Sequence, residues 1–95
     1  MIYLYRDTVN KIVIPSLYCK EKGDYLIDLV FQNEGQEKTI STSLSLSNGR
    51  LYGQLEHVCG PLSSTDNKIN FDVGTYPVEV KHNNIKWLSA MIKIQ

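Results

Sequence analysis

Apolar and polar residues alternate along most of this chain with a period of two, which is typical of β-strands. The clearest segment is 25–32, in which every second residue from Tyr25 to Phe31 is apolar or aromatic. In the segment 38–47, every odd-numbered position is serine or threonine, whereas Ile40 and two leucines lie on the other face. The sequence therefore predicts two amphipathic strands, and we expect the hydroxyl face of the second strand to lie in solvent.

A two-residue turn follows the hydroxyl-rich strand. Asn48-Gly49 is the strongest short hairpin signal in the chain, because a type I′ turn needs a positive φ at both central positions. This turn pairs Leu46 with Leu51 and, further along, Thr42 with Leu55. The pattern therefore predicts an antiparallel partner strand after Gly49.

The strands over 25–32 and 38–47 are expected to form a hairpin of their own. If Gly35-Gln36 forms a type II′ turn, Phe31 pairs with Ile40 and Ile27 with Leu44, so each inward residue meets another inward residue. A shift by one residue would turn the apolar side chains of one strand toward water. We therefore predict a meander over 25–57.

Two further strands are predicted before the C-terminal segment. Residues 68–73 alternate, and Gly74-Thr75 separates them from a strand over 76–82. Pro77 has no N–H to donate to a ladder, so we expect the strand over 76–82 to lie at a sheet edge there.

The C-terminal segment, 85–95, follows a second candidate type I′ turn at Asn83-Asn84, which pairs Val80 with Trp87. The apolar phase changes after Trp87, because the apolar residues that follow have the opposite parity. We expect either a bulge near Ser89 or a strand that is covered on both faces. A strand covered on both faces would complete either its own sheet or that of a neighbouring molecule.

The N-terminal region adds two candidate strands, Ile2–Arg6 and Lys11–Pro15, and the segments 16–24 and 59–67 are rich in turn formers. We expect the strand Ile2–Arg6 to be another sheet edge. Seven or eight short strands in this length predict an all-β fold, namely a single small antiparallel β-sandwich or a partly open barrel that spans residues 1–95 as one domain.

Composition supports this fold class. The chain has 95 residues, enough for one domain, and Ala90 is its single alanine, which disfavours helices. With 42% hydrophobic residues it is not a disordered chain. Ten basic residues balance ten acidic ones, which argues against a nucleic-acid partner, and no apolar run is long enough to span a membrane.

Targeting and cysteine usage favour synthesis in a cytoplasm. The N-terminal residues lack both the basic start and the apolar run of a secretory signal peptide. Cys19 and Cys59 are interpreted as free thiols, since disulfides are rare in chains that are not exported. Whether the two thiols lie close together in space is left open.

Residues that could carry chemistry form no recognisable motif. Cys19, His57, Cys59 and His82 could together bind zinc, but they lack the close ligand pairs that are usual in zinc modules. No nucleophile motif is present, and the six glycines are too dispersed to cradle phosphate. We therefore expect no catalytic, cofactor-binding or metal-binding residues, no enzymatic activity and no small-molecule ligand.

Aromatic residues outside the predicted core are better candidates for function. Tyr3, Tyr5 and Tyr52 fall on strand faces opposite to the core, as Leu88 does in one reading of the last strand. Such side chains can dock against another protein, stack on a sugar, or be covered by the chain's own loops. The candidate interface residues are Tyr3, Tyr5, Tyr52, Tyr76, Trp87 and Leu88.

Three segments carry a resemblance to a known group of proteins: the opening MIYLYRDTVNKIVI, the segment YLIDLVFQNEGQEKTISTSLS and the late VGTYPVEVKHNN. They resemble small virion proteins of tailed bacteriophages, in particular short β-sandwich structural proteins from phages of Bacteroidota, including the crAss-like group. The matching positions are Tyr25, Leu29, Phe31 and Asn33 in one strand, and Gly74, Tyr76, Val78 and Val80 in another. The chain departs from this group by lacking the helix or long polar insertion that such proteins often have.

The resemblance implies a non-enzymatic structural protein of a virion, such as a capsid decoration, a head-fibre subunit or a neck or tail subunit. Its partners would be other virion proteins and further copies of itself, and its location would be the virion after synthesis in the host cytoplasm. The alternative is a small phage or bacterial binding or inhibitor module, either an anti-defence protein or a carbohydrate-binding β-sandwich. Zero net charge argues against a DNA-mimicking inhibitor, and a sugar site would require Tyr5, Tyr52 or Trp87 on one exposed platform.

Overall fold

The computed structural model describes residues 1–15, 23–58 and 68–95. These residues form seven strands and no helix. The strands are β1 (Ile2–Leu4), β2 (Val9–Pro15), β3 (Asp24–Asn33), β4 (Gln36–Ser47), β5 (Arg50–Glu56), β6 (Gly74–His82) and β7 (Ile85–Ile94). The predicted all-β class is confirmed. Cys19, Cys59 and nearly all of the two predicted loops lie outside the described residues, although Asp24 already belongs to β3.

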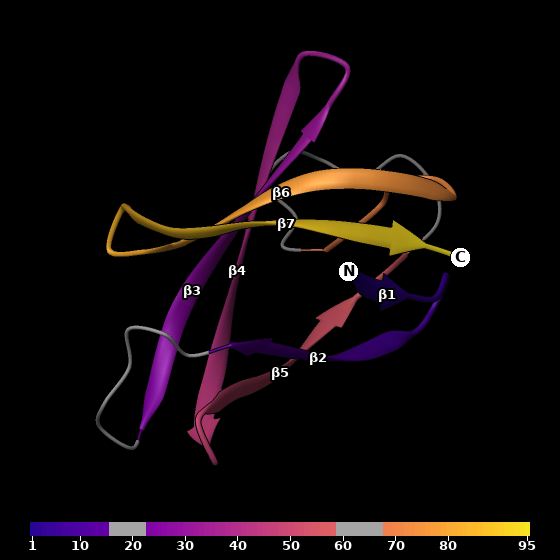
Figure 1. Ribbon diagram of the computed structural model, residues 1–95. Helices are drawn as coiled ribbons and strands as arrows, with labels where there is room; N and C mark the ends of the chain where they lie inside the picture. The colour runs from indigo at the N-terminus through magenta and orange to yellow at the C-terminus, as the bar shows by residue number, and fades with distance from the viewer. Residues whose placement is uncertain (16–22, 59–67) are drawn as a thin grey trace.

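All seven strands belong to one sheet, in the order β1-β7-β6-β3-β4-β5-β2. The sheet curls so that its two edge strands, β1 and β2, approach each other, which gives a nearly closed barrel (Figure 1). The alternative of a partly open barrel therefore describes the fold better than a sandwich of two sheets. The predicted edge at the N-terminal strand is confirmed, since β1 ends the sheet.

The sheet is mixed rather than purely antiparallel, because β1 runs parallel to β7. A ring with an odd number of strands cannot alternate in direction throughout, so one neighbouring pair has to be parallel. The N-terminal strands are also offset from their predicted bounds: β1 ends at Leu4 and β2 already begins at Val9.

Inward-facing side chains fill the barrel, as expected for a barrel of this size. They come from β1 to β7 and from residue 69, and they are the buried apolar residues Leu4, Ile12, Ile14, Ile27, Leu29, Phe31, Ile40, Leu44, Leu51, Leu55, Ile69, Val78, Val80, Ile92 and Ile94. The outward face of β4 carries the serine and threonine side chains, and they are exposed except for the half-buried Ser41, as predicted.

The β3–β4 hairpin turns one residue earlier than predicted. Glu34 and Gly35 have φ values of 48° and 79°, the two positive values of a type I′ turn, and the closing pair is Asn33 with Gln36. Leu29 therefore lies opposite Ile40, in the place that was predicted for Phe31. The ladder moves by two positions, which keeps every side chain on its predicted face, so the inward set is right although the pairs are not.

The β4–β5 hairpin confirms the turn at Asn48-Gly49 and the pair Leu46–Leu51. The ladder covers only Ser45–Ser47 and Arg50–Tyr52, so the predicted pair of Thr42 with Leu55 is wrong. Beyond Tyr52 the strand β5 continues its ladder with β2, where Leu55 lies opposite Asn10.

The β6–β7 hairpin confirms the turn at Asn83-Asn84 and explains the change of phase. Lys81 pairs with Lys86 but Val80 pairs with Leu88, so Trp87 is the extra residue of a bulge. The bulge lies two residues before the predicted position, and the predicted pair of Val80 with Trp87 is wrong for the same reason.

Residues 68–73 do not form the predicted strand. Among the residues that the structure describes, their only ladder contact is an isolated bridge between Ile69 and His57, and β6 already begins at Gly74, which was predicted to separate the two strands. Instead this segment packs on the core: Ile69 is fully buried, and the ring of Phe71 lies 5.5 Å from that of Phe31. Its apolar residues alternate because one side covers the barrel, which does not require a strand partner.

The strand β6 lies between β7 and β3, so the prediction of an edge strand over 76–82 is wrong for the strand as a whole. The ladder with β3 nevertheless stops at Val78, one residue after Pro77. Because Pro77 has no N–H to offer, the proline ends this ladder, and at that residue β6 is paired with β7 alone.

Candidate interaction site

The seam of the barrel, where β1 and β2 meet, is closed at one end by a side chain. Asn10 is 6% exposed and lies at an inward position of β2, in phase with Ile12 and Ile14. Its Oδ1 accepts a hydrogen bond from the N–H of Tyr5 at 2.8 Å, and its Nδ2 donates to the C=O of Tyr5 at 3.0 Å. One side-chain amide therefore supplies both hydrogen bonds that a neighbouring strand would give to Tyr5.

The other end of the seam is open. The strand β1 pairs with β7 only over Ile92–Ile94, so the earlier part of β7 has no strand on that side among the described residues. The Cα atoms of β2 and β7 are everywhere more than 8 Å apart. A groove of about 530 Å³ lies here, which we call the seam groove, and its lining includes Met1, Ile2, Val13, Leu88, Ala90 and Met91.

Exposed apolar side chains continue from the seam groove onto the outer surface. We call them the seam strip, and they are Met1 (67% exposed), Tyr3 (53%), Val13 (43%), Tyr52 (41%) and Met91 (39%). Val13 lies opposite Tyr52 in the β2–β5 ladder, and Val13, Met1 and Met91 line the same groove. The strip therefore crosses the seam and joins the two edges of the sheet.

The charged residues beside the seam strip are cationic. Among the outward positions of β2 from residue 11, of β5 over 50–54 and of β7 from residue 89, the charged side chains are Lys11, Arg50 and Lys93. Lys93 lies opposite Tyr3 in the β1–β7 ladder. The strip thus combines apolar surface with positive charge, although the whole chain is neutral.

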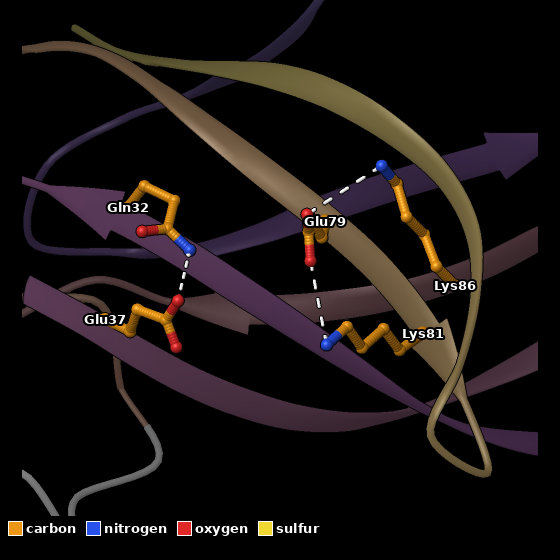
Figure 2. Close-up of polar contacts among 5 residues, drawn as sticks. All are labelled: Gln32, Glu37, Glu79, Lys81 and Lys86. Carbon is orange, nitrogen blue, oxygen red and sulfur yellow. Dashed lines mark hydrogen bonds and ion pairs between the residues drawn. The ribbon is translucent and has the colours of Figure 1, made fainter.

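The outer surface of β3, β4 and β6 is different, because its polar groups contact one another. Ser41 and Ser45 donate hydrogen bonds to Asp28 and Asp24, at 2.5 and 2.7 Å. Figure 2 shows the bond of 2.8 Å from Gln32 to Glu37, and it shows Glu79 between two lysines, Lys81 at 3.6 Å and Lys86 at 3.8 Å. This surface exposes polar groups to water, whereas the seam strip exposes apolar side chains.

The six predicted interface residues do not lie on one surface. Tyr3, Tyr5 and Tyr52 are exposed, as predicted, and two of them belong to the seam strip. Leu88 is half-buried on the inward side of β7, where it packs against the core and lines the seam groove.

Tyr76 and Trp87 are half-buried and contact other parts of the chain. The ring of Tyr76 stacks on Phe71 at 5.0 Å and its hydroxyl donates to the C=O of Asp72 at 2.9 Å. Burial raises the pKa of the Tyr76 hydroxyl, and the negative charges of Asp72 and Glu34 add to this. Trp87 packs against His82, with ring centroids 5.0 Å apart. Both residues therefore stabilise the fold at their own ends of β6.

The two histidines hold backbone groups. His57 is 1% exposed; its Nδ1 accepts from the N–H of Asp7 at 3.1 Å, so Nε2 carries the proton and donates to the C=O of Phe71 at 2.7 Å. His82 donates from Nδ1 to the C=O of Leu26 at 3.0 Å. Within residues 1–15, 23–58 and 68–95, no three His, Cys, Asp or Glu side chains gather as metal ligands would.

The sequence did not predict a role for Asn10 or for the segment 68–73 around Phe71, which packs on the core. A signal for Asn10 was present, because a polar residue in phase with Ile12 and Ile14 occupies an inward position of a strand. Buried polar groups are nearly always hydrogen-bonded, so that position predicts a backbone partner. The seam groove had no comparable signal, since it depends on how far β1 extends along β7.

Comparison of the chain with models of protein families, with curated proteins and with solved structures finds no match in any of the three. In the part of the chain that the structure describes, no helix is long and apolar enough to cross a membrane.

Proposed function

We propose that this chain is a non-enzymatic structural subunit that docks onto other proteins through the seam strip. The resemblance of its strands to small virion proteins makes a tailed-phage virion the proposed setting, where the chain would be a capsid decoration, a head-fibre subunit or a neck or tail subunit. The observation that carries the proposal is the run of exposed apolar side chains across the barrel seam, from Met91 to Tyr52.

The chemistry of the seam strip supports a protein partner. Met and Tyr are among the residues enriched at protein interfaces, and both occur here on rigid strands. Contiguous exposed apolar surface on a small soluble domain marks interaction sites, because it gains free energy only when it leaves water. The polar surface of β3, β4 and β6 would then be the side that remains in solvent.

Charge adds a preference among partners. Lys11, Arg50 and Lys93 flank the strip, so a partner surface that carries Asp or Glu beside its apolar residues would complement it. A second copy of the chain can instead meet the strip with its own seam strip, so that the apolar side chains of both copies leave water. The proposal therefore includes both other virion proteins and further copies of the chain as partners.

Purified virus particles test the proposed setting. Tailed particles propagated from the source of this sequence would be purified through a density gradient and analysed by quantitative mass spectrometry. We expect the chain at a fixed copy number relative to the major capsid protein. Its presence in infected cells together with its absence from the particles would contradict the virion proposal and would favour the inhibitor alternative.

A further inference from the structure

The geometry points to a strand-binding site: the seam groove accepts an extended segment of a partner protein, which inserts between β7 and β2 and completes the barrel. This inference rests on the proposed function, because it specifies how a docking partner engages the seam. Its occupant is a stretch of about five residues, the length that matches groove walls of three to four residues each. Three observations carry it: the direction of the backbone groups, the spacing of the walls and the nature of the lining.

The backbone of β7 presents free groups to the groove. The N–H of Gln95 donates to the C=O of Leu4 at 2.9 Å, so the odd-numbered residues at the end of β7 direct their N–H and C=O toward β1. The bulge lies before Leu88, so this parity extends back through Met91 to Ser89. The pairing of Ile2 with Ile92 takes β1 as far as the C=O of Met91, which accepts from the N–H of Ile2. The N–H of Met91 and both backbone groups of Ser89 lie beyond β1 and face the groove.

The backbone of β2 mirrors this arrangement. The N–H of His57 donates to the C=O of Thr8, so the even-numbered residues of β2 bond to β5, and the odd-numbered ones point away from it. The N–H and C=O of Val13 therefore face the groove from the opposite wall. Pro15, at the end of β2, has no N–H and limits how far a ladder could extend.

The walls of the groove are too far apart to pair with each other directly. Paired strands lie about 4.8 Å apart, so two strands that flank a third lie about 9.6 Å apart. Every Cα–Cα distance between β2 and β7 exceeds 8 Å, whereas in a closed barrel the two strands would lie at the spacing of a direct pair. At the other end of the same seam β1 occupies this position between β7 and β2.

The lining defines the side chains of the occupant. Inward-facing Ile2, Leu88 and Ala90 line the groove, so the occupant needs apolar side chains at alternate positions that point into the barrel. Lys11 and Lys93 each lie two residues beyond an outward residue of the groove walls, Val13 and Met91, so acidic side chains suit the outward positions of the occupant. A segment in which apolar and acidic residues alternate meets both requirements.

A synthetic peptide tests this site directly. The probe is an eight-residue peptide in which valine and glutamate alternate, with a fluorescein label at its N-terminus and an amide at its C-terminus, and it is added to the chain of residues 1–95. We expect saturable binding by fluorescence anisotropy and slower amide exchange at Val13, Ser89 and Met91, by about tenfold or more at saturation. The control peptide has the same side chains but N-methyl groups on alternate amides, and we expect it to bind at least about tenfold more weakly.

Two proline variants provide a matched test on the protein. Ser89→Pro removes an N–H that faces the groove and leaves the β6–β7 ladder intact, so it should weaken peptide binding. Thr75→Pro places a proline on the neighbouring strand, opposite Lys93, and should leave binding unchanged. Unchanged amide exchange at Ile92 would show that each variant folds. If one variant does not fold, the comparison of the plain and methylated peptides on the wild-type chain still tests the site.

Each remaining outcome is decisive. Equal binding of the two peptides, or no added protection at Ser89 and Met91, would overturn the inference. Protection of these two amides by a higher concentration of the chain alone, to the degree that the peptide gives, would also overturn it and would identify a second copy as the occupant. Association through the side chains of the seam strip alone leaves the exchange of these amides unchanged. If particles contain the chain but the peptide does not bind, the strand-binding site fails and the virion proposal stands. If the peptide binds and particles lack the chain, the virion proposal fails instead.

Discussion

The side-chain amide of Asn10 bonds to both backbone polar groups of Tyr5, at 2.8 and 3.0 Å, and so takes the place of a neighbouring strand at the barrel seam. A third hydrogen bond, from Nδ2 to the C=O of Thr8 at 3.3 Å, holds the same amide to the turn that precedes β2. The seam is thus closed by a side chain at one end and left open at the other.

Replacing Asn10 should destabilise the fold. In Asn10→Ala the N–H and C=O of Tyr5 lose their partners, which should lower the free energy of unfolding by about 1–3 kcal/mol. Urea unfolding followed by tryptophan fluorescence measures the change, and Lys11→Ala, an exposed neighbour on β2, is the control, expected to lie within about 0.5 kcal/mol of wild type. Equal stability of the two variants would show that the amide does not hold the seam.

Gly49 should resist substitution for a backbone reason. Its φ is 74° and a Cβ there would meet no atom within 4 Å, so Gly49→Val acts through strain in the turn rather than through a clash. We expect a loss of about 1 kcal/mol or more in the free energy of unfolding. An unchanged denaturation midpoint would contradict the type I′ turn at Asn48-Gly49.

Gly53 should resist substitution for a packing reason. A Cβ at this position would overlap Cδ2 of Leu44 and lie 3.2 Å from the C=O of Ser43, so the absence of a side chain lets β5 approach β4 closely. We expect Gly53→Ala to cost about 1–3 kcal/mol of stability. The double variant Gly53→Ala/Leu44→Val should be destabilised by less than the sum of the single variants, and strict additivity would rule out the contact.

The two histidines should carry opposite tautomers. His57 accepts at Nδ1 and donates at Nε2, whereas His82 donates at Nδ1 and accepts at Nε2 from the side chain of Asn83 at 3.2 Å. Nitrogen-15 chemical shifts of the rings, recorded at a pH of about 8 where ordinary histidines are neutral, distinguish the two forms. The same tautomer at both positions would contradict the hydrogen bonds at one of them.

The sequence predicted the strands better than their connections in space. Alternation placed Phe31 and Ile40 inward correctly, because a ladder shifted by two positions preserves the faces. It could not place the turn at Glu34-Gly35, since glutamate at positive φ is an unusual choice that the hairpin imposes. It also assigned 68–73 to a strand, because an apolar segment that covers a barrel has the same period as a strand.

The candidate site was only partly predictable. Exposure of Tyr3 and Tyr52 followed from strand parity, which depends on local pattern alone. The seam groove depends on closure of the sheet, and therefore on the parallel contact of β1 with β7, which joins residues about ninety positions apart. Tyr76 and Trp87 were misplaced although the rings that pack against them, Phe71 and His82, are only five residues away, because alternation does not show how the chain turns between them.

The most direct test of docking through the seam strip is size-exclusion chromatography with light scattering over a range of concentrations. We expect wild-type chain to show a mass that rises with concentration above the monomer mass of 10.8 kDa. The variant Val13→Lys/Tyr52→Lys should remain at the monomer mass, whereas Thr39→Lys, on the exposed face of β4 opposite Val30, should behave as wild type. A wild-type mass of 10.8 kDa at every concentration, or association that the double variant leaves intact, would contradict the account.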